Sequence, residues 1–169
     1  MISENDKLNT EINDDGEGEI VTYDSFDMMN LDDKLLRGIY TYGYEKPSAI
    51  QSKAIKPIVD GRDIIAQSQS GSGKTATFLI GNLNKIDLTV NKPQVLILAP
   101  NRELATQIHL VMQSLNTYLK CTSVLLIGGK KINVDIDNIE KGVQLIIGTP
   151  GRVYDMIKRY VLKTDKIKS

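Results

Sequence analysis

Apolar and polar residues follow two different periods along this chain. Short apolar runs, typical of parallel strands covered on both faces, occupy residues 63–67, 94–99, 123–127 and 143–147. Elsewhere apolar residues recur every three or four positions, which predicts helices over residues 31–40, 48–59, 74–86, 102–119, 134–141 and 149–160. The apolar stripe predicted for the helix 102–119 consists of Leu104, Ile108, Val111, Leu115 and Leu119. His109 falls off this stripe, and we expect it to be solvated.

This order of elements predicts the fold class. We expect Asn30 to cap the first helix and Ser48 to cap the second. Strands that alternate with helices through short connections indicate one α/β domain, with a mostly parallel sheet and helices on both faces. In such sheets ligands bind beyond the carboxyl ends of the strands. The four connections that follow the strands are therefore expected to line one edge of the sheet.

The first of these connections has the composition of a phosphate-binding loop. Residues 68–75, called the phosphate loop below, read Ser-Gln-Ser-Gly-Ser-Gly-Lys-Thr between an apolar run and a predicted helix. Its backbone N–H groups and the positive end of the helix would attract a polyphosphate. Lys74 can reach the β- and γ-phosphates, and the Thr75 hydroxyl can bind Mg²⁺; the general motif begins with glycine, where this chain has Ser68. A Gly/Ser linker is the alternative, but the apolar flanks and the Lys-Thr ending favour a nucleotide site.

The other three connections also combine backbone amides with positive charge. They are Pro100-Asn101-Arg102, Gly128-Gly129 and Thr149-Pro150-Gly151-Arg152. In the last of them, Thr149 can cap a helix and Pro150 suits the first helical position. Each one alone is equally well explained as an ordinary strand-to-helix connection. Together, beside a phosphate loop, they predict a track for a phosphodiester chain that is contacted through its phosphates rather than its base edges.

Length and composition limit the remaining classes. The 169 residues suit one domain, and the single cysteine, Cys121, excludes an internal disulfide framework. Because Cys121 opens an apolar run, we expect it to be buried rather than nucleophilic. The sequence has no apolar stretch long enough for a membrane span and no signal peptide at its start, so we expect a cytoplasmic or nuclear protein.

The net charge of zero hides an asymmetry. Residues 1–22 contain seven acidic residues and one lysine, a balance of −6, so residues 23–169 carry +6. The acidic segment has few large apolar residues, and burial cannot offset its ordering entropy. We therefore predict a disordered acidic tail over residues 1–22 and a folded domain over 23–169. An acidic arm that competes with nucleic acid for the basic domain is the functional alternative.

Five segments in order resemble the motifs of the DEAD-box RNA helicases, and the resemblance covers residues 24–169. Phe26 with residues 43–51 is similar to the Q motif, and residues 66–75 are similar to motif I, with Ser68 where alanine is more usual. Residues 100–105 resemble motif Ia with Asn101 in place of threonine, and Gly128-Gly129 and residues 149–152 match the next two RNA-contacting motifs. Within the family, the sequence of these motifs resembles that of the initiation-factor-4A group. The resemblance does not decide between the translation factor of this group and its nuclear, exon-junction relative.

The resemblance implies a RecA-like domain that binds ATP, Mg²⁺ through that ATP, and RNA without sequence preference. Gln51 would hydrogen-bond the adenine edge, Tyr44 and Phe26 would stack near or buttress the base, and Lys46 would lie beside it. The implied nucleotide site comprises Phe26, Tyr44, Lys46, Gln51, Ser70, Gly71, Ser72, Gly73, Lys74, Thr75 and Ala76, with Lys74 and Thr75 as catalytic residues and Thr75 on the metal. The implied RNA site comprises Pro100, Arg102, Glu103, Gly128, Gly129, Thr149, Pro150, Gly151 and Arg152. Scaffold, initiation or exon-junction proteins are the implied protein partners.

The Asp-Glu-Ala-Asp sequence that gives this family its name does not occur in the chain. The resemblance implies that its strand would begin after residues 166–168 and that a second domain would supply arginine fingers. We therefore expect an N-terminal part of an ATP-dependent RNA helicase that alone binds ATP weakly or not at all and hydrolyses none. Unpaired strand edges would make it poorly stable or drive dimerisation or strand swapping. An ATP-gated RNA clamp and another phosphotransferase with a phosphate loop are the alternatives.

Overall fold

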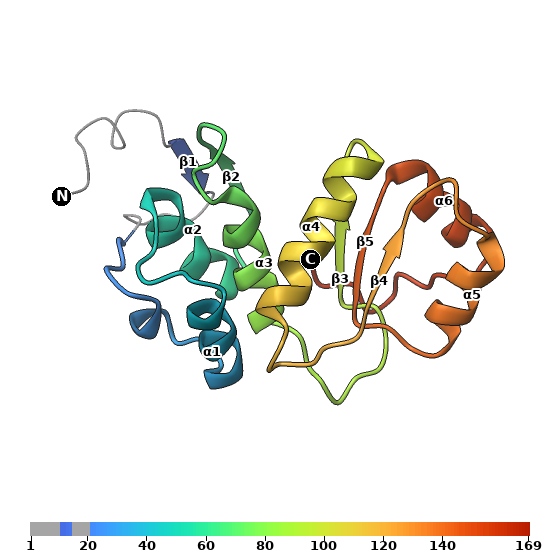
Figure 1. The fold of residues 1–169 in the computed structure, drawn as a ribbon, viewed down its shortest axis with the longest axis horizontal. Helices are drawn as coiled ribbons and strands as arrows, with labels where there is room; N and C mark the ends of the chain where they lie inside the picture. Colours follow the sequence, from blue (N-terminus) through green and yellow to red (C-terminus); the bar gives the residue numbers. More distant parts are fainter. Residues whose placement is uncertain (1–10, 15–20) are drawn as a thin grey trace. The chain divides into compact units, whose positions relative to one another are not determined.

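The computed structural model describes residues 11–14 and 21–169, which fall into two compact units (Figure 1). Unit 1 comprises residues 1–85 and 114–119, and unit 2 comprises residues 86–113 and 120–169. The described helices include none with the length and apolarity that a membrane span requires.

Unit 1 contains three α-helices, a short 3-10 helix and a two-stranded sheet. Its elements are β1 (Glu11–Asp14), η2 (Phe26–Met29), α1 (Asp33–Thr41), α2 (Ala49–Val59), β2 (Ile64–Gln67) and α3 (Lys74–Asn84). Helix α1 begins after Asp32, whose carboxylate accepts hydrogen bonds from the backbone N–H of Lys34 at 2.8 Å and of Leu35 at 3.4 Å. The predicted cap, Asn30, is wrong, because this residue ends η2 in the left-handed conformation with φ 56°. Ser48 caps α2 as predicted and forms a capping box with Gln51.

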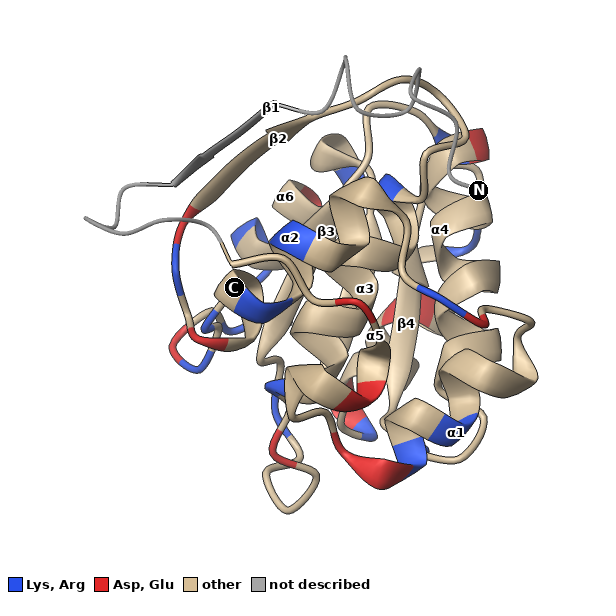
Figure 2. Cartoon of the chain, turned by 90° about the vertical axis from the view of Figure 1, so that its left-hand side faces the viewer, with Lys and Arg blue, Asp and Glu red and all other residues tan. Residues whose placement is uncertain are grey.

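Strand β2, which leads into the phosphate loop, differs from its prediction. It pairs antiparallel with β1, with Glu11 opposite Gln67 and Asp14 opposite Ile64. The strand carries no charged residue and is drawn in tan (Figure 2), yet it is not buried: Ile65 is 74% exposed. Its apolar sequence predicted coverage on both faces, but in the described residues its sheet consists only of β1 and β2.

Strand β1 itself falls within the predicted disordered tail. The sequence predicts no structure for residues 1–22, but four of them form a strand, while residues 1–10 and 15–20 lie outside the described residues. A strand edge offers a row of N–H and C=O groups, so a mostly polar segment can gain hydrogen bonds there without burying much apolar surface.

Unit 2 contains the parallel sheet and confirms the predicted α/β class. Its strands are β3 (Val95–Leu98), β4 (Ser123–Leu126) and β5 (Leu145–Gly148), in the order β3-β5-β4. Its helices are α4 (Arg102–Leu115), whose last residues belong to unit 1, α5 (Ile132–Glu140) and α6 (Pro150–Lys158). The end of the chain lies along β3, since the N–H of Lys168 donates to the C=O of Gln94 and the N–H of Leu96 donates to the C=O of Ser169, both at 2.8 Å.

The core of unit 2 lies where α5 and α6 pack against the sheet (Figure 1). Its buried members are Val124, Leu126, Ile139, Val143, Ile146, Val153, Met156 and Leu162. Cys121 is buried as predicted.

The buried face of α4 is shifted from the predicted stripe. Ala105 and Met112 are buried, whereas Leu104 is 36% exposed. Ala105 and Met112 each lie one position after a residue of the predicted stripe and take its place in the core. The spacing of the large apolar residues alone did not reveal this shift. His109, which was predicted to be solvated, is half-buried.

Candidate functional sites in the two units

The phosphate loop connects β2 to α3 in unit 1 through two glycines in the left-handed region. Gly71 has φ 80° and Gly73 has φ 97°. A Cβ atom at Gly73 would lie 2.7 Å from Nε2 of Gln51, so the loop and helix α2 approach too closely for any side chain at this position. The loop and the Q-motif segment, which the sequence predicts as one nucleotide site, therefore lie in contact.

Side chains of the loop bond to the loop itself. Nζ of Lys74 donates to the backbone carbonyls of Ser68 and Gln69, the latter at 2.7 Å. The hydroxyls of Ser68 and Ser72 share a hydrogen bond, and the Ser48 hydroxyl donates to the carbonyl of Ser72 at 2.8 Å. The ammonium that the sequence assigns to the phosphates is thus bound to two carbonyl oxygens here.

Gln51 is held between the cap of α2 and the phosphate loop. Its side chain is only 2% exposed, and its Oε1 accepts from the backbone N–H of Ser48 at 2.8 Å. The predicted adenine contact therefore requires this amide to exchange its capping bond or to use its remaining groups. The Nε2 group of this amide lies beside Gly73 of the loop, and a glutamine amide can donate through it while Oε1 accepts.

The aromatic residues of the predicted nucleotide site divide into a buried support and a partly exposed ring. Phe26 is fully buried, and its ring centroid lies 6.5 Å from that of Tyr44. Phe26 therefore buttresses Tyr44 and presents no face of its own to a base. Tyr44 is half-buried beside Tyr42, with centroids 4.9 Å apart, and burial, followed by the neighbouring Tyr42, raises the pKa of the Tyr44 phenol. Lys46 is exposed.

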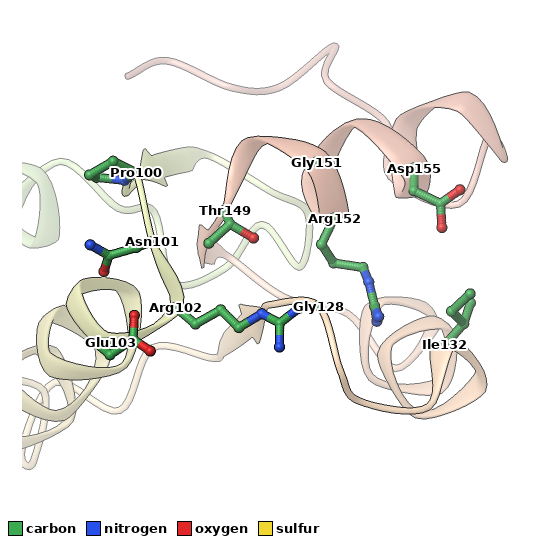
Figure 3. Close-up of a pocket in the computed structure, with 10 residues that line it drawn as sticks. All are labelled: Pro100, Asn101, Arg102, Glu103, Gly128, Ile132, Thr149, Gly151, Arg152 and Asp155. Atoms are coloured by element: carbon green, nitrogen blue, oxygen red, sulfur yellow. The ribbon is translucent and has the colours of Figure 1, made fainter.

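Unit 2 carries a pocket of about 740 Å³ at the carboxyl ends of its strands (Figure 3). The connections after β3, β4 and β5 all contribute to it, so the structure brings together three of the four connections that were expected to share a sheet edge. The fourth, the phosphate loop, follows β2 in the other sheet. The lining residues are Pro100, Asn101, Arg102, Glu103, Gly128, Ile132, Thr149, Gly151, Arg152 and Asp155.

Arg102 lies against the glycine pair in this pocket. A Cβ atom at Gly128 would be 2.9 Å from Nη2 of Arg102, and one at Gly129 would be 2.9 Å from Nη1. Gly129 also has φ 90°. The two glycines therefore form a flat backbone surface on which the guanidinium rests while the arginine side chain stays exposed (Figure 3). The close neighbour of the glycine pair in this structure is the guanidinium of Arg102.

Two residues at the helix starts of the pocket differ in how they cap. Oδ1 of Asn101 accepts from the backbone N–H of Leu104 at 2.8 Å, so this amide caps α4 and keeps its NH₂ group available to a ligand. Thr149 occupies the cap position of α6 and Pro150 the first helical position, as predicted, but the Thr149 hydroxyl makes no capping hydrogen bond.

Arg152 is bound to the protein. Its guanidinium donates to the carboxylate of Asp135 and to the carbonyl of Lys130 at 3.0 Å, and its side chain points towards the start of α5 (Figure 3). The side chains of Arg152 and Asp135 are 10% and 2% exposed. Arg152 thus ties the start of α6 to α5, in addition to lining the pocket.

Asp135 was missed from the sequence, although a signal for it exists. It lies on the same helical face as Ile132 and Ile139, three residues after one and four before the other. A carboxylate on an apolar stripe is expected to have a basic partner when it is buried.

Comparisons with known proteins bear directly on these sites. The family model for the "DEAD/DEAH box helicase" matches residues 48–168, which is most of the chain and includes Gln51, the phosphate loop and the pocket of unit 2. The chain belongs to the DEAD/DEAH box helicase family. The predicted resemblance is therefore confirmed.

Curated relatives of this DEAD/DEAH box chain are longer than it is. Eukaryotic initiation factor 4A of Drosophila melanogaster is 58% identical over 146 residues, which are 86% of this chain and 36% of the relative. The ATP-dependent RNA helicase eIF4A of Chaetomium globosum is 55% identical over 147 residues, 87% of this chain and 37% of the relative. The chain thus spans little more than a third of these relatives.

Solved structures confirm the RecA-like fold class of this DEAD/DEAH box chain. A DEAD box protein from the hyperthermophile Methanococcus jannaschii aligns with a TM-score of 0.79 and 33% identity, over 87% of this chain and 40% of the other. Saccharomyces cerevisiae Dbp5 bound to RNA and ADP BeF3 aligns with a TM-score of 0.74 and 35% identity, over 86% of this chain and 37% of the other.

Proposed function

We propose that the protein containing this chain is an ATP-dependent RNA helicase, in which unit 1 binds ATP and unit 2 binds the RNA backbone. The observation that carries the proposal is the pocket of unit 2, where three strand-to-helix connections converge around an exposed arginine in a chain that also has a phosphate loop. A phosphotransferase acting on a small molecule would need an acceptor pocket, but gives no reason for Arg102 to rest on a glycine pair.

ATP would bind through the phosphate loop and the Q-motif segment, and the closeness of Gln51 to Gly73 supports this. Backbone amides of residues 71–75 and the ammonium of Lys74 would bind the phosphates, and Tyr44 and Gln51 would contact the adenine. Family membership implies nucleotide binding, and the Dbp5 structure named above holds ADP BeF3. The described residues contain no group of three or more acidic, His or Cys side chains that could hold a metal, so Mg²⁺ would be shared between the Thr75 hydroxyl and phosphate oxygens.

RNA would bind along the pocket of unit 2 through its phosphates. Arg102 offers an exposed guanidinium, and the amides after Pro100, Gly128 and Thr149 offer hydrogen-bond donors at the same edge. Such contacts carry no base information, so we expect little sequence preference. The nearly buried Arg152 would hold the start of α6 in place and contribute its positive field.

In the complete protein, ATP and RNA would each favour a closed arrangement with a second domain, and each would then strengthen binding of the other. Closure would bend one RNA strand and open a short duplex locally, and hydrolysis would release it. A cytoplasmic or nuclear location and scaffold partners of the initiation or exon-junction type belong to the same proposal. Dbp5 bound to Gle1 gives an example of a protein partner for a structural relative.

RNA-stimulated ATP hydrolysis and unwinding of a short duplex by the full-length protein test the proposal. We expect multiple turnovers that Lys74→Met and Arg102→Ala abolish or strongly reduce. Lys92→Met is the control, because this exposed lysine precedes β3 and lies at the opposite end of that strand from Pro100. Stimulation by a small metabolite instead of RNA would point to a phosphotransferase, and ATP-dependent RNA retention without turnover would point to a clamp.

A further inference from the structure

Several hydrogen-bond donors of the phosphate loop are used within the loop. Two of the three N–H groups of the Lys74 ammonium face the carbonyls of Ser68 and Gln69. The backbone N–H of Ser72 donates to the carbonyl of Gln69 at 3.4 Å. A polyphosphate needs these same donors, and inward carbonyl oxygens would repel its own oxygens. Phosphate binding therefore requires the loop to exchange internal bonds for bonds to the ligand.

One hydrogen bond between side chains joins two positions across the phosphate loop. The hydroxyls of Ser68 and Ser72 share a hydrogen bond across the loop. Ser72 is also fixed from outside, because its carbonyl accepts from the Ser48 hydroxyl at 2.8 Å and the next residue, Gly73, lies against Gln51. The general motif has glycine at the position of Ser68, and glycine has no hydroxyl to make such a bond.

We propose that the Ser68–Ser72 hydrogen bond is a latch that stabilises the internally bonded loop and so lowers its affinity for ATP. Ser68 is then a positioning residue: it acts through Lys74, because the bond keeps the Ser68 carbonyl where the ammonium binds it. The inference rests on the proposed function, since ATP is the ligand whose affinity the latch would set. Its structural part, a loop held closed by two hydroxyls, is independent of any ligand.

The expected size follows from the strength of one hydrogen bond. A ligand that binds only the open loop has its affinity reduced by the fraction of molecules in which the loop is open. Loss of one ordinary hydrogen bond from the closed loop should therefore tighten ATP binding by about two- to tenfold.

The test is a mutant cycle with two measurements. Ser68→Ala, Ser72→Ala and the double variant are compared in the full-length protein, with a fluorescent ATP analogue and Mg²⁺ as the binding probe. Amide hydrogen exchange of residues 69–73 is measured without nucleotide. Ser52→Ala is the matched control, because its hydroxyl bonds to the carbonyl of Ala49 within α2 and not to a residue of the loop.

The latch predicts that each single variant binds the probe about two- to tenfold more tightly and exchanges its loop amides faster by a similar factor. The double variant should match the single variants, because all three lack the same bond. Unchanged exchange in Ser68→Ala, additive effects in the double variant, or weaker probe binding would overturn the latch. If neither the natural protein nor any variant bound the probe while exchange still rose, the proposed ATP site would be wrong, and only the structural part of the latch would stand.

Discussion

The guanidinium of Arg152 donates to the carboxylate of Asp135, and the two side chains are almost inaccessible to solvent. Removing the charge of Asp135 leaves an arginine buried without its partner. We expect Asp135→Asn to lower the free energy of unfolding by about 3–5 kcal/mol, measured by urea denaturation. Asp155→Asn is the control, since Asp155 pairs with Arg159 at 2.9 Å on the surface and should change stability by about 0.5 kcal/mol or less. Equal changes in the free energy of unfolding for the two substitutions would contradict the prediction, because the buried pair would then contribute no more than the surface pair.

Gly38 in α1 lies where no side chain fits. A Cβ atom there would be 2.1 Å from the backbone carbonyl oxygen of Leu115. Although alanine is the better helix former, we expect Gly38→Ala to destabilise the protein by about 1–3 kcal/mol, because a backbone carbonyl cannot move aside cheaply. Gly151 in α6 has open space around its Cβ position, so Gly151→Ala should leave the thermal midpoint equal or slightly higher. A stabilising effect of Gly38→Ala would contradict this packing.

His109 should make stability depend on pH. Burial, and then the positive charge of Lys130, lower the pKa of its imidazole below the ordinary 6.5. The folded state therefore favours the neutral ring, and its contribution is fully present above pH 6.5 and lost as the pH falls through the lower folded pKa. His109→Gln should flatten the stability profile below about pH 6.5. Because the chain has a single histidine, one imidazole signal in an NMR titration reports this pKa directly, and a value above 6.5 would contradict the prediction.

Cys121 should be chemically inert in the folded protein. It is buried at the end of the loop before β4, and burial raises the pKa of its thiol to about 12. Since the thiolate is the reactive form, a thiol reagent at pH 8 should label it much more slowly than a cysteine in denaturant. The chain has one cysteine, so the labelling rate needs no assignment. Equal rates in the folded and unfolded protein would contradict the described burial.

The parts of the fold that the sequence predicts are those decided by local chemistry. Ser48 followed by Gln51 three residues later specifies a capping box, and the structure has it. The phosphate loop likewise follows from its own residues. The cap of α1 was misassigned because Asn30 and Asp32 both suit a cap, and only the turn that Asn30 makes at the end of η2 separates them.

The missed parts depend on partners far away in the sequence. The apolar run of β2 predicts burial but cannot say which segment will pair with it, and four residues of the acidic tail do so. Arg102 and the glycine pair are about 26 residues apart, and their contact appears only when β3 and β4 lie in one sheet. The assignment of Arg152 to RNA from its motif alone could not show that Asp135 binds its guanidinium.

Separate titrations of ATP and RNA test the central claim most directly. The full-length protein with Lys74→Met should lose ATP binding and keep its nucleotide-independent affinity for single-stranded RNA, whereas Arg102→Ala should lose RNA affinity and keep ATP binding. If both substitutions weakened the same ligand and spared the other, the division of ATP to unit 1 and RNA to unit 2 would be wrong.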